Sequence, residues 1–179
     1  AVSSLRTSLS IHGCSLVKEM AGRLQEKIDP LAEGLFNSLR NVLSATKKLA
    51  SQNAFFAACS LLAAMQFHNR IFQSCFMLSK DKNVSPRCFG AVFLRIFLIR
   101  FHSKLDNGLV YIDEWVHRSI TDAQTKVRES MRTTFWYYYK AYPTNAKRLL
   151  DGLLPHFRRA VEAPIPPNLD INYSMGNTK

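Results

Sequence analysis

Basic residues gather in short polar turns, each of which stands directly before a segment with helical periodicity. The turns span residues 4–8, 45–48, 80–83 and 122–126, and Arg87 and Arg128 lie in the first helical turns after the last two. A cation at the amide end of a helix costs about 0.3–1 kcal/mol, whereas an acidic residue would stabilise it. The same departure from stability at four equivalent places indicates a function. If the turns share one edge, their cations and helix amino ends form a ridge suited to carboxylates. The alternative is that they are ordinary solvated turns of a basic chain.

The sequence offers no grouping of residues typical of catalysis. The five histidines lack metal-ligand spacing, and Asp113 and Glu114 form the only adjacent acidic pair. A glycine-rich phosphate loop, a G-x-S-x-G segment and an H-E-x-x-H segment are all missing from the sequence. We therefore expect a protein that is not an enzyme and that has neither a cofactor nor a metal site.

The four cysteines, Cys14, Cys59, Cys75 and Cys88, show no C-x-x-C spacing and have mainly apolar neighbours. Zinc sites draw ligands from close pairs, and secreted disulfide domains are smaller and denser in cysteine. Free cysteine is among the most buried residue types. The pattern predicts reduced thiols in the core and a reducing, intracellular compartment.

The chain is strongly basic, with a net charge of +11 over 179 residues. Such a charge implies an acidic partner, and nucleic acid, acidic lipid and acidic protein all satisfy this condition. The longest apolar stretch, residues 89–99, contains Arg95 and is too short to span a membrane. We expect neither a membrane segment nor a signal peptide, and Ala1 in place of methionine suggests a piece of a longer protein.

Helical periodicity dominates the sequence and predicts an all-α fold. The expected helices span residues 9–24, 30–43, 50–65, 70–78, 86–101, 109–120, 127–142, 145–153 and 155–163. The second helix of each pair begins near Leu9, Leu49, Val84 or Val127, so the repeat is about 40 residues long. This period is typical of HEAT-like arrays, in which neighbouring pairs stack into an α-solenoid.

The aromatic run at residues 135–139 has two interpretations. It could stack on bases of a nucleic acid. However, Phe135, Tyr138, Tyr139 and Tyr142 recur at the spacing of a helix's buried stripe, which favours core packing. We also expect Trp115 to pack against the neighbouring helix pair.

Several segments together resemble the TOG domains of the CLASP family of microtubule-associated proteins. The stretch TDAQTKVRESMRTTFWYYYKAYPTNAKRLLDGLLPHFRRAVEA looks like that family's fifth and sixth helix pairs, with its VR opening and its FW aromatic pair. The segments SSLRTSLSIHG, LSATKKLASQ and KNVSPRCF look like the inner turns of the second, third and fourth pairs. The basic, aromatic-rich character is similar to the second, tubulin-binding TOG domain of a budding-yeast member.

This resemblance implies a TOG domain of HEAT-like pairs B to F over residues 1–163, followed by a Pro-rich extended tail at 164–179. The first pair, which carries an anchoring aromatic in the family, is absent. The inner turns would bind the αβ-tubulin heterodimer. The implied contacts are Leu5, Arg6 and Thr7 in the second pair; Thr46, Lys47 and Lys48 in the third; Lys80, Lys82 and Asn83 in the fourth; and Gln124, Thr125, Lys126 and Arg128 in the fifth.

The function expected from the resemblance is a tubulin-binding and microtubule-binding module of a regulator of microtubule dynamics at the mitotic spindle. Kinetochore or spindle proteins would be further partners, and the protein would reside in the cytoplasm and on the cytoskeleton, with spindle and nuclear pools in a yeast with closed mitosis. One alternative is a HEAT adaptor that binds a different acidic protein, such as a kinetochore component. Another is nucleic-acid binding through charge alone, although the sequence contains no base-reading module to favour it.

Overall fold

The computed structural model of the chain describes residue 2, residues 7–163 and residue 169, and in these residues it contains helices and no strand. The α-helices are α1 (Thr7–Leu24), α2 (Asp29–Leu43), α3 (Lys48–Ala64), α4 (Asn69–Leu78), α5 (Val84–Phe101), α6 (Leu109–Ile120), α7 (Thr125–Ala141), α8 (Pro143–Asp151) and α9 (Pro155–Glu162). Three short 3-10 turns join them: η1 (Gln25–Ile28), η2 (His102–Lys104) and η3 (Asp106–Gly108). The predicted all-α class is confirmed.

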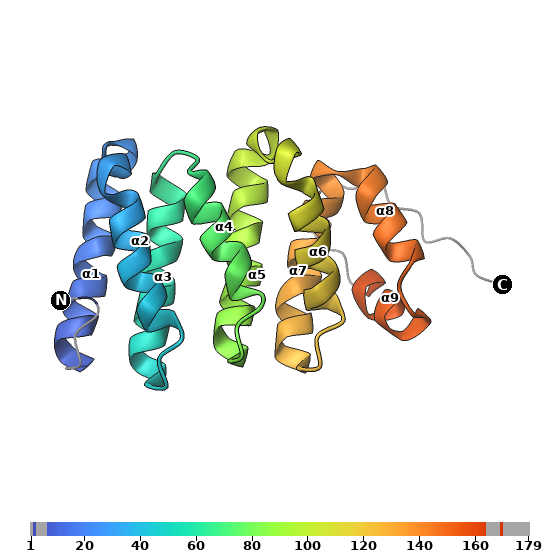
Figure 1. Cartoon of the computed structure of the whole chain (residues 1–179), viewed down its shortest axis with the longest axis horizontal. Coiled ribbons are helices and arrows are strands. Elements are labelled where there is room, and N and C mark those ends of the chain that lie inside the picture. Colours follow the sequence, from blue (N-terminus) through green and yellow to red (C-terminus); the bar gives the residue numbers. More distant parts are fainter. Residues whose placement is uncertain (1, 3–6, 164–168, 170–179) are drawn as a thin grey trace.

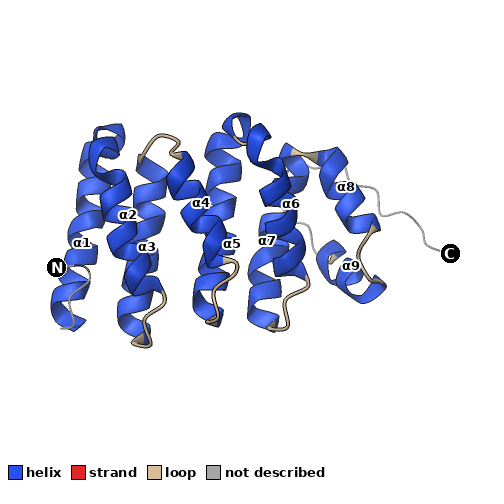
Figure 2. Cartoon of the chain, in the orientation of Figure 1, coloured by secondary structure: helices blue, strands red, loops and turns tan. Residues whose placement is uncertain are grey.

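The helices stack as pairs in two layers (Figure 1). Helices α1, α3, α5 and α7 pack side by side in one layer, and α2, α4 and α6 form the layer in front of it. Each front helix runs antiparallel to the next back helix, so the chain alternates between the two edges of the array. The connections before α3, α5 and α7 all lie on the lower edge, where α1 also begins (Figure 2). The array is therefore the predicted solenoid, with its basic turns on one side.

The predicted helices agree with the observed ones to within about two residues at each end. Helices α1, α3, α5, α7 and α8 each begin two residues before the predicted position. For α3, α5 and α7 the turn geometry gives the reason. Their N-caps, Lys47, Asn83 and Gln124, have extended backbones, so the turn ends abruptly and the next residue is already helical. Residues 106–108, between two predicted helices, form a short 3-10 turn.

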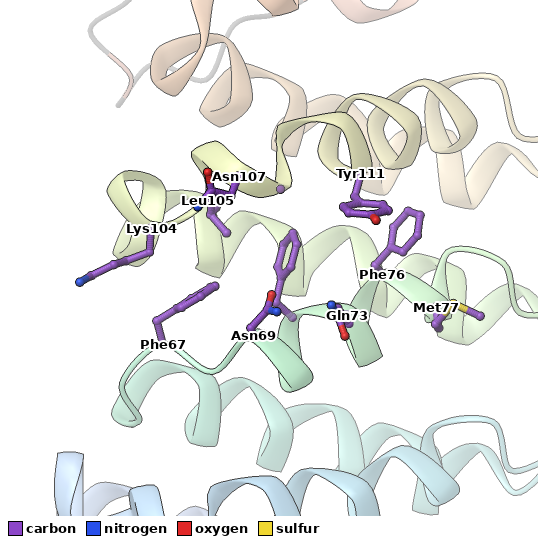
Figure 3. A pocket seen from close by; sticks show the side chains of 11 residues that line it. Phe67, Asn69, Gln73, Phe76, Met77, Lys104, Leu105, Asn107 and Tyr111 are labelled. Atoms are coloured by element: carbon purple, nitrogen blue, oxygen red, sulfur yellow. The ribbon is translucent and has the colours of Figure 1, made fainter.

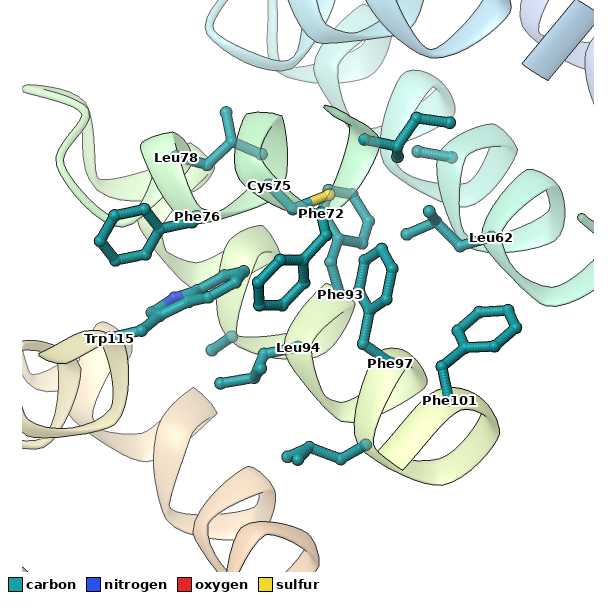
Figure 4. Packing of buried hydrophobic residues seen from close by; sticks show 14 of the residues in the cluster. Leu62, Phe72, Cys75, Phe76, Leu78, Phe93, Leu94, Phe97, Phe101 and Trp115 are labelled. Atoms are coloured by element: carbon teal, nitrogen blue, oxygen red, sulfur yellow. The ribbon is translucent and has the colours of Figure 1, made fainter. Parts of the chain in front are cut away.

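Interlocking aromatic rings fill the centre of the array. Trp115 of α6 is fully buried against Phe72 and Phe76 of α4, with ring centroids 6.2 and 5.9 Å apart (Figure 4). Phe97 of α5 meets Phe72 edge-on at 5.2 Å. Such pairs add about 0.5–1.5 kcal/mol each beyond the area that they bury. The prediction that Trp115 packs against the neighbouring pair is confirmed.

The aromatic segment of α7 lies mainly in the core. Phe135 and Tyr138 are fully buried, as the helical stripe predicts, whereas Tyr139 and Tyr142 are only half-buried. Trp136 falls outside the predicted stripe but is also buried, and its indole Nε1 donates to the carbonyl oxygen of Val161 at 3.2 Å. Helix α9 covers that side of α7. These buried rings cannot stack on bases, so core packing is the correct interpretation.

The four cysteines carry no disulfide. Cys14 and Cys75 lie in the core, as predicted, while Cys59 and Cys88 are half-buried. Burial raises the pKa of Cys75 well above its ordinary value and raises the pKa of Cys59 to about 12. These two thiols therefore stay protonated at neutral pH.

The upper edge of the array is cross-linked between neighbouring pairs. The guanidinium Nη1 of Arg100 donates to the carbonyl oxygens of Leu62 and Met65 at 2.7 and 2.8 Å, which joins the end of α5 to the end of α3. The hydroxyl of Tyr142 donates to the carbonyl oxygen of His102 at 2.7 Å, which joins the end of α7 to η2. These bonds fix how successive pairs meet on the side away from the basic turns.

Among the helices of the described residues, none combines the length and apolarity that crossing a bilayer requires.

Candidate partner-binding edge

The lower edge carries three turns followed by the amino ends of back-layer helices. We define the turn edge as residues 44–47, 79–83 and 121–124 together with the first turns of α3, α5 and α7. None of these three helices has an acidic residue in its first turn. Each therefore presents an amide end whose partial positive charge is not offset within that turn.

The turn before α5 is held from within by Asp81 and Arg87. A carboxylate oxygen of Asp81 accepts the backbone N–H of Asn83 at 2.7 Å. The guanidinium Nη1 of Arg87 donates to the carbonyl oxygens of Asp81 and Lys82 at 2.9 and 3.1 Å. Together these bonds satisfy backbone groups that an open loop would leave to water.

The turn before α7 repeats this arrangement with the same spacing. Asp122 accepts the backbone N–H of Gln124 at 2.8 Å. Arg128 donates through Nη1 to the carbonyl oxygens of Asp122 and Ala123 at 2.7 and 2.9 Å, and through Nη2 to the hydroxyl of Thr125 at 2.8 Å. In both turns the arginine follows the aspartate by six residues, so the motif is D-x-[NQ]-x-x-x-R.

The turns are also bonded to one another. Arg87 binds Asp122 through two hydrogen bonds, Nε to Oδ2 at 2.8 Å and Nη2 to Oδ1 at 3.2 Å, and the two side chains are only 15% and 9% exposed. The hydroxyl of Ser44 donates to Asp81 at 2.8 Å. We call this continuous chain, formed by Ser44, Asp81, Arg87, Asp122 and Arg128, the turn ladder. It holds three turns from different helix pairs in fixed relation.

The turn at residues 44–47 has no arginine that donates to its own carbonyl oxygens. Ala50 occupies the position that matches Arg87 and Arg128, six residues after Ser44. This turn is held instead by the hydroxyl of Ser51, which donates to the carbonyl oxygen of Leu43 at 2.8 Å, and by the contact between Ser44 and Asp81.

Most of the residues expected to contact a partner lie exposed on this edge. The exposed members are Thr46, Lys47, Lys48, Lys80, Lys82, Asn83, Gln124, Thr125 and Lys126. They come from three turns that lie along the lower edge of the array (Figure 1). Thr7, at the start of α1, is half-buried on the same edge, and Leu5 and Arg6 lie outside the described residues.

Two of the expected contact residues face elsewhere. The ammonium of Lys80 pairs with Glu114 of α6 at 2.9 Å and sits 4.5 Å above the ring of Phe76. The hydrogen bond from Lys80 lowers the pKa of Glu114. Arg128 is half-buried, and its donors point back into its own turn. Lys80 therefore braces the front layer and Arg128 shapes the third turn.

The acidic members of the turn ladder are not among the functional residues expected from the sequence. Asp81 and Asp122 stand inside stretches interpreted for their cations, although each makes the turn around it. The repeated six-residue spacing between aspartate and arginine was the available signal. In the part of the chain that the structure describes, no group of three or more His, Cys, Asp or Glu side chains could hold a metal ion.

The sequence is similar to known proteins over nearly its whole length. A family profile described as "CLASP N terminal" matches residues 1–162. The chain is 51% identical over 175 residues to Protein STU1 of Eremothecium gossypii and 46% identical over 172 residues to Protein STU1 of Kluyveromyces lactis. These alignments cover 98% and 95% of this chain but only 12% and 13% of the two relatives, so the chain matches about an eighth of their length. The helical array and these similarities together show that the chain belongs to the CLASP family.

Proposed function

We propose that the chain is a TOG module that binds the αβ-tubulin heterodimer through the turn edge, as part of a regulator of microtubule dynamics. One observation carries this proposal: the turn ladder holds three turns in register while Lys47, Lys48, Lys82 and Lys126 remain exposed. Membership of the CLASP family supports tubulin, whose surface is acidic, as the partner.

Binding would use an edge that already has its final shape. The net charge of +11 attracts an acidic partner over a distance and raises the rate of encounter. The exposed lysines then meet carboxylates, and Asn83 and Gln124 offer amide groups beside them. Because the turns are already ordered by their internal hydrogen bonds, little conformational entropy is lost on binding. Arg87 and Arg128 act in this scheme as positioning residues.

The proposed setting is the mitotic spindle. The module would correspond to the second TOG domain of its parent protein and would help that protein to promote rescue or suppress catastrophe of microtubules. Kinetochore or spindle proteins would be further partners. The parent protein would occupy the cytoplasm and cytoskeleton and, where mitosis is closed, the nucleus.

The test is a comparison of two double variants that lose the same charge. Lys47→Ala with Lys126→Ala removes cations from two turns of the edge. Lys27→Ala with Lys140→Ala removes two exposed lysines from η1 and the last turn of α7, at the other end of the helices. Tubulin affinity is measured for both by size-exclusion chromatography and analytical ultracentrifugation.

We expect the edge variant to lose at least about tenfold in tubulin affinity, equivalent to ~1.4 kcal/mol, and the control variant to lose much less. Both should unfold at nearly the wild-type temperature, because exposed lysines contribute little to stability. Equal losses in the two variants would show that net charge alone drives the association and would remove the turn edge from the proposal.

A further inference from the structure

A groove opens in the front layer between α4 and the segment from η2 to α6. It has a volume of about 510 Å³ and runs from Phe67 and Lys104 at one end to Met77 and Tyr111 at the other (Figure 3). No residue that lines it belongs to the turn edge. The groove is therefore a second surface, and a molecule bound there would leave the basic turns free.

One wall of the groove is a single face of α4. Its members are Asn69, Phe72, Gln73, Phe76 and Met77, which follow the i, i+3, i+4, i+7, i+8 spacing of a helix face. At 1.5 Å per residue, this face is about 12 Å long, or roughly two helical turns. The groove thus has the length of a short helix laid alongside α4.

The floor is pre-formed and apolar. The rings of Phe72 and Phe76 are fixed from below by Trp115, and Phe76 also contacts Tyr111 with ring centroids 5.5 Å apart. At Gly108 the backbone comes close to this floor, since a β-carbon there would stand 3.3 Å from the ring of Phe72. A larger residue at that position would press on the ring of Phe72, whereas glycine leaves this part of the groove open.

The rim chemistry indicates what fits. Met77 and Tyr111 are 49% and 50% exposed, so apolar surface that could be buried faces water at the far end. Amide side chains of asparagine and glutamine stand along both walls. Among the described residues that line the groove, Lys104 is the one that carries a full charge, and no carboxylate accompanies it. A ligand that matches this lining is apolar on one face and acidic near one end.

We propose that this groove binds a short amphipathic helix of another protein, about two turns long, with apolar anchors at i and i+3 or i+4 and an acidic residue opposite Lys104. Helix-in-groove recognition uses this combination of a preformed apolar trough and spaced anchors. The exposed side chains of Met77 and Tyr111 contact the apolar anchors of the bound helix. Lys104, at the other end of the groove, sets the direction in which that helix lies. The inference stands independently of tubulin binding, because the two surfaces share no residue.

The experiment is selection of displayed random twelve-residue peptides on the full chain, followed by fluorescence anisotropy with the most enriched peptide. Met77→Glu places a carboxylate on the groove rim without burying it. Leu31→Glu is the matched control, since Leu31 is 50% exposed on the front helix α2 and lies outside the groove. Lys104→Glu reverses the charge of the lining.

Selection on the wild type should enrich peptides with two apolar residues three or four positions apart and at least one aspartate or glutamate. Met77→Glu should weaken the best peptide by at least about tenfold, whereas Leu31→Glu should leave its affinity unchanged. Selection on Lys104→Glu should favour lysine or arginine at the acidic position. This switch in preference is a readout that mere damage to the fold would not produce.

Three outcomes would overturn the proposal. The first is that no peptide is enriched on the wild type. The second is that the enriched peptides bind Met77→Glu as tightly as the wild type, which would place them on another surface. The third is that light scattering shows a dimer that Met77→Glu dissociates, which would assign the groove to a second copy of this chain.

Discussion

Replacing Arg87 with alanine tests the turn ladder at its most connected point. The change removes two hydrogen bonds to Asp122 and two to backbone carbonyls of residues 81 and 82. It also leaves the carboxylate of Asp122, whose side chain is only 9% exposed, without its cation. Breaking a fully buried ion pair costs about 3–5 kcal/mol. Since Arg87 keeps 15% exposure, we expect about 3 kcal/mol, at the low end of that range.

In a domain of this size, that loss corresponds to a fall of about 6–12 °C in the unfolding temperature. Urea denaturation monitored by circular dichroism gives the free energy of unfolding. Arg70→Ala is the matched control, because Arg70 is 80% exposed and makes one contact with Glu33 at 3.3 Å. Exposed pairs of this kind contribute about 0–1 kcal/mol.

A double-mutant cycle with Asp122→Asn separates the pair from the rest of the turn. We expect a coupling energy above about 1 kcal/mol, because residues in direct contact are not additive. The free energy of unfolding of Arg87→Ala could instead lie within about 0.5 kcal/mol of the wild-type value, which is roughly the scatter of a surface substitution. That result would show that the turn ladder does not stabilise the fold.

Two further predictions concern single side chains. Lys82→Ala should weaken tubulin binding more than Lys80→Ala, since Lys82 is exposed on the turn edge while Lys80 is paired with Glu114; a pull-down with purified tubulin compares them, and equal losses would contradict this assignment. Burial raises the pKa of Cys59 from 9.0 to about 12, so the folded protein retains a proton that the unfolded chain loses above pH 9. The contribution of the protonated Cys59 thiol to the free energy of unfolding is complete below pH 9. It should decline toward pH 12, by up to about 1.4 kcal/mol per pH unit. Denaturation of the wild type and of Cys59→Ser over this range should show a steeper decline in the wild type, and parallel curves would refute the assignment.

The helices could be predicted because their signals are local. Apolar periodicity sets the limits of α2, α5 and α9 to within about two residues. The stacking of pairs followed from the repeat length, since a helix pair of about 40 residues cannot bury its apolar face alone. The common edge of the basic turns followed in turn from the stacking (Figure 2).

The direction of long side chains could not be predicted. Arg128 and Lys126 stand two positions apart on α7, yet the first reaches back to the carbonyls of its own turn and the second faces water. An arginine can extend either way, and only the position of the carbonyl oxygens decides between them. Trp136 shows the same limit, because its burial depends on α9, which packs from about 25 residues further along the chain. Tertiary contacts of this kind leave no mark in helical periodicity.

The array is cross-linked along both edges, by the turn ladder below and by Arg100 and Tyr142 above. A solenoid whose helix pairs are bonded to one another along one edge only could bend by opening the other edge. An array cross-linked on both sides keeps its shape unless these hydrogen bonds break. Those that involve a charged group contribute about 1.5–3 kcal/mol each, and the neutral bond from Tyr142 contributes about 0.5–1.5 kcal/mol. We therefore expect the domain to resist bending. A domain of fixed shape would bind two conformations of one partner with different affinities, even if both conformations present the same residues.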